Sequence, residues 1–144
     1  MRALVQTALG VATVDLEEDE VVELDEDATL EVSPVETGLP RVVWADGQGA
    51  TVVAVVDRRP PLLVSGDAGT TWHEAGGGLP AGRAVAVSPD HPDLVLYAGE
   101  SRLFLSTDGA RFWRALATEL PDITAVAWDQ PQSGSDPGGL TPGV

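Results

Sequence analysis

Short apolar runs separated by turn-forming residues recur along the chain. These runs are rich in β-branched and aromatic residues and are bounded by Gly, Pro or Asp, which is typical of short strands. No stretch keeps the apolar period of about 3.6 residues that an amphipathic helix requires. The pattern therefore predicts an all-β protein. The clearest predicted strands are Val42–Trp44, Thr51–Val56, Pro61–Ser65, Thr71–Glu74, Ala84–Ser88, Leu94–Gly99, Leu103–Ser106 and Phe112–Ala115.

The runs belong to a repeat of about 41 residues. The segment LLVSGDAGTTW (Leu62–Trp72) is echoed by LFLSTDGARFW (Leu103–Trp113). Four short strands in each repeat is the spacing of a β-propeller blade. We expect four-stranded antiparallel blades at about 1–40, 41–81 and 82–122, one extra closing strand within 123–129, and a disordered Gly-, Pro- and Ser-rich tail at 130–144.

Two of the predicted hairpins carry a specific motif. SGDAGTTW (Ser65–Trp72) matches the pattern Ser-x-Asp-x-Gly-x-Thr-Trp in full, and STDGARFW (Ser106–Trp113) matches it with the glycine one place early. A worn copy at Asp25–Val32 keeps only the central acid and an apolar end. These segments resemble the Asp-box, or BNR repeat, of sialidase-like, sortilin-like and photosystem-assembly-factor-like β-propellers (WD40/YVTN/BNR-like folds). The resemblance implies a propeller over about residues 20–130 but no single function, because the motif occurs in enzymes and binding proteins alike.

The residue types of the motif suit a structural role. We expect the Asp67 carboxylate to accept hydrogen bonds from its own turn, Gly69 to adopt a positive φ, and Trp72 to pack between blades. The resemblance implies that the motif forms the hairpin between the third and fourth strands of a blade. A catalytic or metal-binding role for Asp67 or Asp108 is the alternative, and the structural role is preferred because the turn uses the carboxylate. The predicted structural set is Ser65, Asp67, Gly69, Thr71, Trp72, Ser106, Asp108, Gly109 and Trp113.

Composition narrows the chemistry further. The chain has 144 residues, no cysteine, and 8 basic against 23 acidic residues, for a net charge of −15. An acidic balance opposes binding to nucleic acid, and the absence of cysteine removes disulfides and thiolate chemistry. All basic residues are arginine, which excludes lysine-based Schiff-base and P-loop chemistry and is common in GC-rich bacterial genomes. No run is long enough for a spanning helix, so no membrane partner is expected. The opening MRALVQTALGVA favours a strand over a secretory signal, which predicts a cytoplasmic location with secretion left open.

A sialidase-like glycoside hydrolase is the main enzymatic alternative. That family requires a tyrosine nucleophile with a paired glutamate and three arginines around a carboxylate. Tyr97 is the only tyrosine, and Glu100 lies three residues away, which places the two on opposite faces of a strand. Arg41, Arg83 and Arg102 are the candidate arginines. We assign no catalytic residue and predict a non-enzymatic binding or scaffold module first. A hydrolase, or a remnant of a larger propeller enzyme, is the second hypothesis.

The sequence predicts no cofactor and at most a weak Ca²⁺ site. His73 and His91 are isolated, and a metal site requires more histidines or a tight carboxylate set. The acidic run Asp15–Asp27 has Asp25 and Asp27 as candidate ligands for Ca²⁺. A solvated acidic strand edge, which discourages aggregation, is preferred for this run.

Three blades and one strand do not complete a ring, since closed propellers have about four to eight blades. Inter-blade faces carrying Trp44, Val87 and Trp128 would expose a large apolar patch. We therefore expect a homodimer of six blades, in which Ile123–Trp128 joins a blade of the partner chain through Ile123, Val126 and Trp128. A fragment of a larger ring and an open stack are the alternatives. The acidic inventory favours a basic peptide or protein, another cation or, for a hydrolase, a carbohydrate as ligand.

Overall fold

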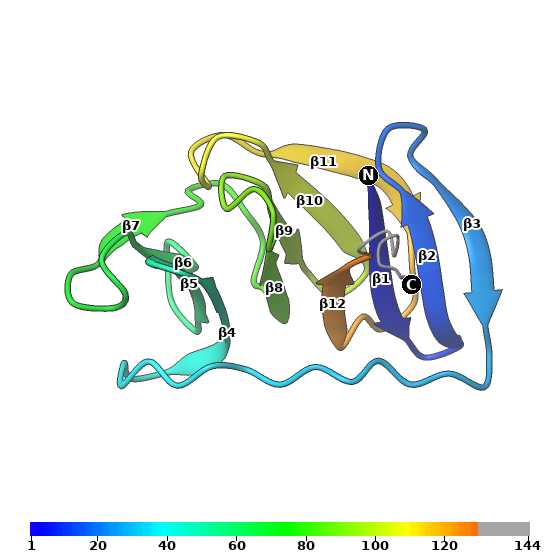
Figure 1. Cartoon of the computed structure of the whole chain (residues 1–144). Coiled ribbons are helices and arrows are strands. Elements are labelled where there is room, and N and C mark those ends of the chain that lie inside the picture. The colour runs from blue at the N-terminus through cyan, green and yellow to red at the C-terminus, as the bar shows by residue number, and fades with distance from the viewer. Residues whose placement is uncertain (130–144) are drawn as a thin grey trace, which may run out of the picture.

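The computed structural model describes residues 1–129, which fold into twelve strands in three four-stranded antiparallel sheets (Figure 1). The prediction of an all-β protein is therefore confirmed. The predicted disordered tail at 130–144 lies outside the described residues. Within residues 1–129, no helix is long and apolar enough to cross a membrane.

Each sheet has one inner and one outer strand at its edges. The first sheet contains, from inner to outer, β12 (Ala125–Trp128), β1 (Arg2–Thr7), β2 (Gly10–Asp15) and β3 (Glu20–Asp25). The second contains β4 (Val42–Gln48), β5 (Thr51–Val56), β6 (Leu62–Ser65) and β7 (His73–Ala75). The third contains β8 (Ala84–Val87), β9 (Val95–Ala98), β10 (Arg102–Ser106) and β11 (Arg114–Glu119).

The first sheet corrects two expectations. The closing strand β12 pairs with β1 of the same chain, with Ala3 opposite Trp128 and Val5 opposite Val126. This strand is thus paired within its own first sheet, where we had expected pairing with a blade of a partner chain, and residues 1–40 supply three strands of their sheet instead of four. The physical reason is that β1 has a free edge of backbone hydrogen-bonding groups, and β12 pairs them. Ile123, just before β12, is fully buried.

The order of the sheets in space differs from their order along the chain. The third sheet lies between the other two, and its inner strand β8 contacts both β4 and β12 (Figure 1). The connections from β7 to β8 (76–83) and from β11 to β12 (120–124) are short because they join neighbouring sheets. Residues 26–41, which we name the strap, instead run from β3 past the third sheet to β4 at the opposite end (Figure 1).

The core fills the two junctions between the sheets, because alternating strand residues face the neighbouring sheet. Between the first and third sheets the largest fully buried side chains are Val5, Val14, Leu16, Leu96, Leu103, Leu116 and Ile123. Between the second and third sheets they are Val53, Val55, Leu62, Val85 and Tyr97. Full burial of one such aliphatic side chain stabilises the fold by about 1.5–3 kcal/mol. The two junctions hold the three sheets in one row.

The phase of the repeat in the first sheet also differs from the expectation. The two segments that resemble the Asp-box, Ser65–Trp72 and Ser106–Trp113, which we refer to by that name, connect β6 to β7 and β10 to β11, the third and fourth strands of their sheets. The corresponding hairpin of the first sheet is β2–β3, with its loop at 16–19. Asp25–Val32, predicted as a worn copy of the motif, instead spans the end of β3 and the start of the strap. Strand β12, from the far end of the chain, takes the inner position of the first sheet. Strands β1, β2 and β3 are therefore its second, third and fourth strands, which makes β2–β3 the hairpin that corresponds to the motif.

Candidate functional site

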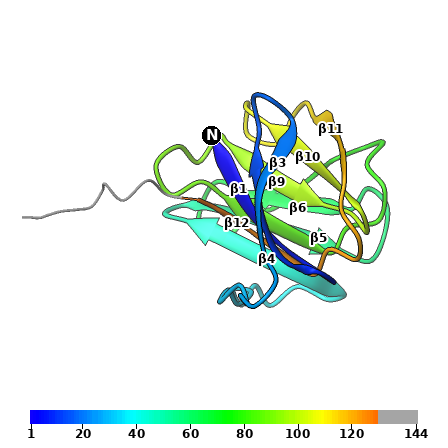
Figure 2. The ribbon, with the colours of Figure 1, turned by 90° about the vertical axis from the view of Figure 1, so that its right-hand side faces the viewer.

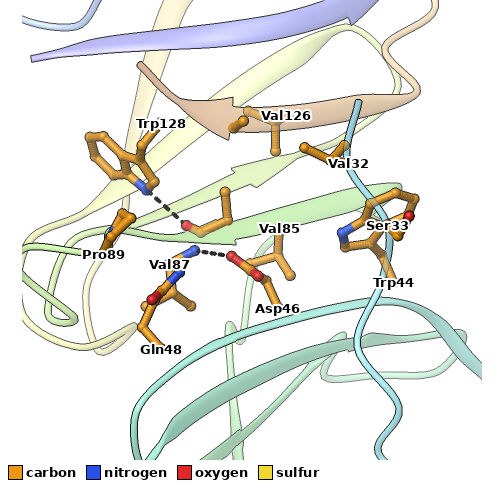
Figure 3. Close-up of a pocket in the computed structure, with 12 residues that line it drawn as sticks. Val32, Ser33, Trp44, Asp46, Gln48, Val85, Val87, Pro89, Val126 and Trp128 are labelled. Atoms are coloured by element: carbon orange, nitrogen blue, oxygen red, sulfur yellow. Dashed lines mark hydrogen bonds between the residues drawn. The ribbon is translucent and has the colours of Figure 1, made fainter. Parts of the chain in front are cut away.

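The three inner strands β4, β8 and β12 surround a pocket of about 210 Å³, which we name the hub pocket (Figure 3). The strap contributes Val32 and Ser33 to its wall. Residues of β4, β8 and β12 form most of the remaining wall. The polar and aromatic side chains of the wall are Ser33, Trp44, Asp46, Gln48 and Trp128.

Asp46 is the carboxylate of the hub pocket. Its Oδ2 accepts a hydrogen bond from the backbone N–H of Val87 at 2.8 Å, which links β4 to β8. Burial raises the pKa of Asp46 above its ordinary value, although the N–H groups of Val87 and Gly47 act in the opposite direction. Among residues 1–129, none of the ion pairs involves Asp46. The pocket therefore contains a partly buried carboxylate with no cationic side chain among the described residues of its wall.

Two tryptophans flank this carboxylate. Trp44 on β4 is partly buried and packs against both main core clusters. Trp128 on β12 donates its indole Nε1–H to the carbonyl of Ala86 at 3.0 Å, which fixes the ring against β8. In Figure 3 the two indoles lie on either side of Asp46. Indole faces attract cations through their π electrons, and a nearby carboxylate adds to that attraction.

The first Asp-box turn uses its polar side chains internally. Asp67 Oδ1 accepts hydrogen bonds from the N–H of Thr71 at 2.8 Å and from Ser65 Oγ at 2.7 Å, and its Oδ2 accepts one from Thr71 Oγ1 at 2.6 Å. These donors, led by the Thr71 hydroxyl, lower the pKa of Asp67 to about 2. Ser65 Oγ also accepts from the N–H of Gly69 at 2.8 Å. Both carboxylate oxygens are thus engaged within the turn.

The second Asp-box turn reproduces this network and explains the displaced glycine. Asp108 Oδ1 accepts from the N–H of Phe112 at 3.0 Å, and this bond is the main cause that lowers the pKa of Asp108. Two consecutive residues have positive φ in each turn: Gly109 at 73° and Ala110 at 74° here, Ala68 at 59° and Gly69 at 91° in the first turn. The turn therefore requires two left-handed residues, and each sequence supplies one glycine, at alternate places.

The two motif tryptophans pack in different surroundings. Trp113 packs in the junction between the second and third sheets, with its ring centroid 5.9 Å from that of Tyr97. Trp72 instead packs against a small cluster on the face of the second sheet that points away from the third. That cluster consists of Ala45, Ala54, Val56 and Leu63. Trp72 thus lies at one end of the row of sheets.

The residues considered for a sialidase-like site are not assembled into one. Tyr97 is fully buried, and its hydroxyl donates to the carbonyl of Pro80 at 2.5 Å. Burial raises the pKa of Tyr97 to about 12. Arg83 pairs with Glu100 at 3.3 Å and Arg102 pairs with Glu119 at 2.9 Å, on the exposed surface. The third candidate, Arg41, immediately precedes β4 at the end of the strap.

The candidate metal ligands and the histidines are also dispersed. Asp25 Oδ1 accepts from the N–H of Asp27 at 3.0 Å, so it closes a local turn. His73 is exposed on the edge strand β7, and His91 lies in the loop between β8 and β9. No group of three or more His, Cys, Asp or Glu side chains within the described part of the chain is arranged to hold a metal ion. The acidic strand β3 is an edge strand and is exposed along its length.

The hub pocket was not predictable as a site from the sequence. Trp44 and Trp128 were named only as residues of inter-blade faces, and nothing in the sequence showed that they line one pocket with Asp46. One local signal was present, because the acid Asp46 follows the apolar run Val42–Ala45 within one inner strand. A scan against models of known protein families and a search among curated proteins both found no match to this chain.

Proposed function

We propose that this chain is a non-enzymatic binding module of the β-propeller type, whose ring is completed by a second copy. In this proposal the hub pocket binds a cationic group, the guanidinium or ammonium of a basic peptide or protein. The observation that carries the proposal is the position of Asp46 between Trp44 and Trp128, with none of the ion pairs of residues 1–129 using its carboxylate.

The propeller interpretation rests on the internal repetition of the chain. Two hairpins with the same Ser–Asp hydrogen-bond network connect the third and fourth strands of two sheets. The inner strands of all three sheets line one pocket, as the inner strands of propeller blades line a central channel. Three sheets are fewer than a closed ring needs, which supports completion by a second copy.

The cationic ligand rests on the chemistry of the pocket wall. A desolvated carboxylate favours a positively charged partner. The net charge of −15 attracts cations toward the molecule over longer distances. Most glycoside hydrolases use two carboxyl groups, and sialidases use a tyrosine nucleophile, whereas Asp46 is the one acid among the described residues of the wall, which include no tyrosine. These features favour binding over glycoside hydrolysis.

The test is a titration followed through the indole N–H resonances of the four tryptophans. N-acetyl-arginine methylamide and tetramethylammonium are the cationic probes, and N-acetyl-leucine methylamide is the neutral control. We expect saturable shifts at Trp44 and Trp128 and none at Trp72 or Trp113, which lie outside the hub pocket. Equal shifts at all four indoles, or none at any, would overturn the proposal.

Variants separate the pocket from general attraction by the acidic surface. Asp46→Asn retains an oxygen acceptor for Val87 N–H but removes the charge, and we expect it to weaken binding of both cations at least tenfold. Glu18→Gln removes one charge from the exposed hairpin loop and is the matched control, expected to bind like the wild type. A fluorogenic glycoside is the enzymatic check. If the wild type hydrolysed this glycoside and Asp46→Asn did not, the hub pocket would be a catalytic site and the binding proposal would be wrong.

A further inference from the structure

A second and larger cavity shares Trp128 with the hub pocket. Its volume is about 520 Å³, within the range of about 300–1,000 Å³ that is typical of small-molecule sites. One part of its wall is formed by the start of β1 and the end of β12, and the other by the loop at 88–94 between β8 and β9. Figure 2 shows the start of β1, marked N, beside this loop. We name this cavity the His91 pocket, because His91 is part of its wall.

Hydrogen bonds hold both parts of this wall in place. Within the loop, the N–H of Ser88 donates to the carbonyl of Leu94 at 3.0 Å, and the N–H of Leu94 donates to the carbonyl of His91 at 2.8 Å. The N–H of His91 donates to Ser88 Oγ at 3.3 Å. On the other side, the N–H of Asp129 donates to the carbonyl of Arg2 at 3.0 Å, which continues the pairing of β12 with β1. The pocket is therefore formed before a ligand binds, which lowers the entropy lost on binding.

The wall contains charged groups of both signs. They are the guanidinium of Arg2 and the carboxylates of Asp90 and Asp129, and among residues 1–129 no ion pair involves any of the three. Asp15 lies opposite Arg2 on β2, but its Oδ1 accepts a hydrogen bond from the N–H of Glu18 at 3.0 Å. This N–H is the main cause that lowers the pKa of Asp15, and the charge of Arg2 contributes less. A ligand can therefore pair with all three charged groups of the wall.

The rest of the wall supplies a buried hydroxyl and apolar surface. Ser88 is only 4% exposed, and its oxygen accepts the hydrogen bond from the N–H of His91. None of the side-chain hydrogen bonds of residues 1–129 has the Ser88 hydroxyl as donor, and a buried donor without an acceptor costs free energy. An acceptor oxygen of a ligand would remove that cost. The apolar side chains of the wall are Met1, Leu94 and Trp128.

We propose that the His91 pocket binds an α-amino acid with an apolar side chain, which it recognises through both charges of the zwitterion. Arg2 and the hydroxyl of Ser88 bind the α-carboxylate, since a guanidinium matches the geometry of a carboxylate. The two aspartates of the wall bind the α-ammonium group, and the apolar side chain packs against Leu94 and Trp128. A ligand with a single charge would leave either the arginine or the aspartates without a partner. This inference depends neither on the ring nor on the ligand of the hub pocket.

The test is a titration of the full chain with L-leucine, followed through the imidazole resonances of its two histidines at constant pH and salt. His91 lines the pocket, and His73 on the edge strand β7 is the internal reference. N-acetyl-leucine lacks the ammonium group, leucinamide lacks the carboxylate, and glycine lacks the apolar side chain. We expect a saturable shift at His91 and none at His73. Each of the three analogues should bind at least tenfold more weakly than leucine.

Variants assign each charge of the ligand to its partner. Arg2→Gln should weaken leucine binding at least tenfold but leave leucinamide binding nearly unchanged, because leucinamide has no carboxylate. Asp129→Asn should weaken the binding of both. Asp93→Asn is the matched control, since Asp93 is in the same loop but outside the wall of the pocket. Circular dichroism establishes that each variant is folded, and the analogue series on the wild type tests the proposal without any substitution.

Three results would overturn this inference. They are no shift at His91, binding of leucinamide or N-acetyl-leucine as tight as that of leucine, and equal losses in Asp93→Asn and Asp129→Asn. The Trp44 indole separates this inference from the proposed function, because Trp44 lines the hub pocket and is not part of the His91 pocket. Leucine should leave the Trp44 resonance in place, whereas the cationic probes of the hub pocket should shift it. Leucine that shifted Trp44 but not His91 would bind in the hub pocket, which would also overturn this inference.

Discussion

The carboxylate of Asp46 and the backbone N–H of Val87 are joined by a hydrogen bond of 2.8 Å between two sheets. The carbonyl oxygen of the neighbouring residue Ala86 accepts a hydrogen bond of 3.0 Å from the indole N–H of Trp128 on β12. Strand β8 is therefore held from β4 and from β12 at consecutive residues. These two bonds set the width of the hub pocket, so its shape depends on side chains as well as on the core.

Replacement of Asp46 by Asn tests whether the buried charge opposes folding. Because the pKa of Asp46 is raised in the folded state, its protonation favours folding. That stabilisation is fully present below the unfolded pKa, near 3.9, and is lost as the pH rises through the folded pKa. We expect Asp46→Asn to have a thermal midpoint at least equal to the wild type at about pH 7, with the advantage gone by about pH 3. Thermal melts over this range measure it, and a lower midpoint at neutral pH would contradict it.

Replacement of Asp67 by Ala tests the Asp-box turn with the opposite pH dependence. The pKa of Asp67 is lowered to about 2, so its stabilising contribution is present above the unfolded pKa and is lost as the pH falls toward 2. Asp67→Ala should therefore lower the thermal midpoint at neutral pH, and the difference from the wild type should narrow below about pH 4. Glu18→Ala, in an exposed loop, is the control and should change little. A constant difference at all pH values would argue against this carboxylate as the cause.

Glycine substitutions test the need for two left-handed residues in the turn. Ala68 is exposed with φ of 59°, so Ala68→Gly should stabilise the fold by about 0.5–1 kcal/mol. Gly69 has φ of 91°, and Gly69→Ala should destabilise it by about 1 kcal/mol. Gly66→Ala is the matched control, because an added Cβ there meets nothing within 4 Å and φ is not positive. Urea denaturation measures all three, and a destabilised Ala68→Gly would refute the two-residue requirement.

Replacement of Tyr97 by Phe tests its structural role. The change removes one hydrogen bond to the Pro80 carbonyl but keeps the ring in the core, so stability should fall by about 1 kcal/mol. Tyr97→Ala should cost about 3–5 kcal/mol, since it opens a cavity beside Phe104 and Trp113. Phe112→Ala is the control, because Phe112 is 78% exposed, and it should stay within about 0.5 kcal/mol of the wild type. Equal losses for Tyr97→Phe and Tyr97→Ala would contradict this account.

The strand positions were predictable because their signals are local. Continuous apolar runs and bounding turn residues define β5 and β6 in the sequence, and the structure places both strands within a residue of the prediction. The hydrogen bonds of the first Asp-box turn join residues at most four positions apart, between Ser65 and Thr71. Such contacts depend on neighbouring residues alone, so a short motif specifies them.

The partner of the closing strand was not predictable in the same way. Its sequence, AVAW, is compatible with any free strand edge, in this chain or in another copy. Tertiary structure places Trp128 opposite Ala3, at the other end of the chain, and so shifts the phase of the first sheet. The course of the strap was not predictable from its own residues either. It runs past the third sheet because it joins β3 of the first sheet to β4 of the second, and the third sheet lies between these two.

The sequence by itself determined the all-β class, the inner three strands of the second and third sheets, and the polar network of each Asp-box-like turn, because these depend on interactions between residues close in the chain. The outer strands β7 and β11 each begin two residues later than the predicted strands Thr71–Glu74 and Phe112–Ala115. Only the tertiary structure decided that β12 closes the first sheet and that Trp44, Asp46 and Trp128 meet around β8. These contacts join residues far apart in sequence, and they form only when packing of the sheet faces offsets the entropy lost on closing long loops.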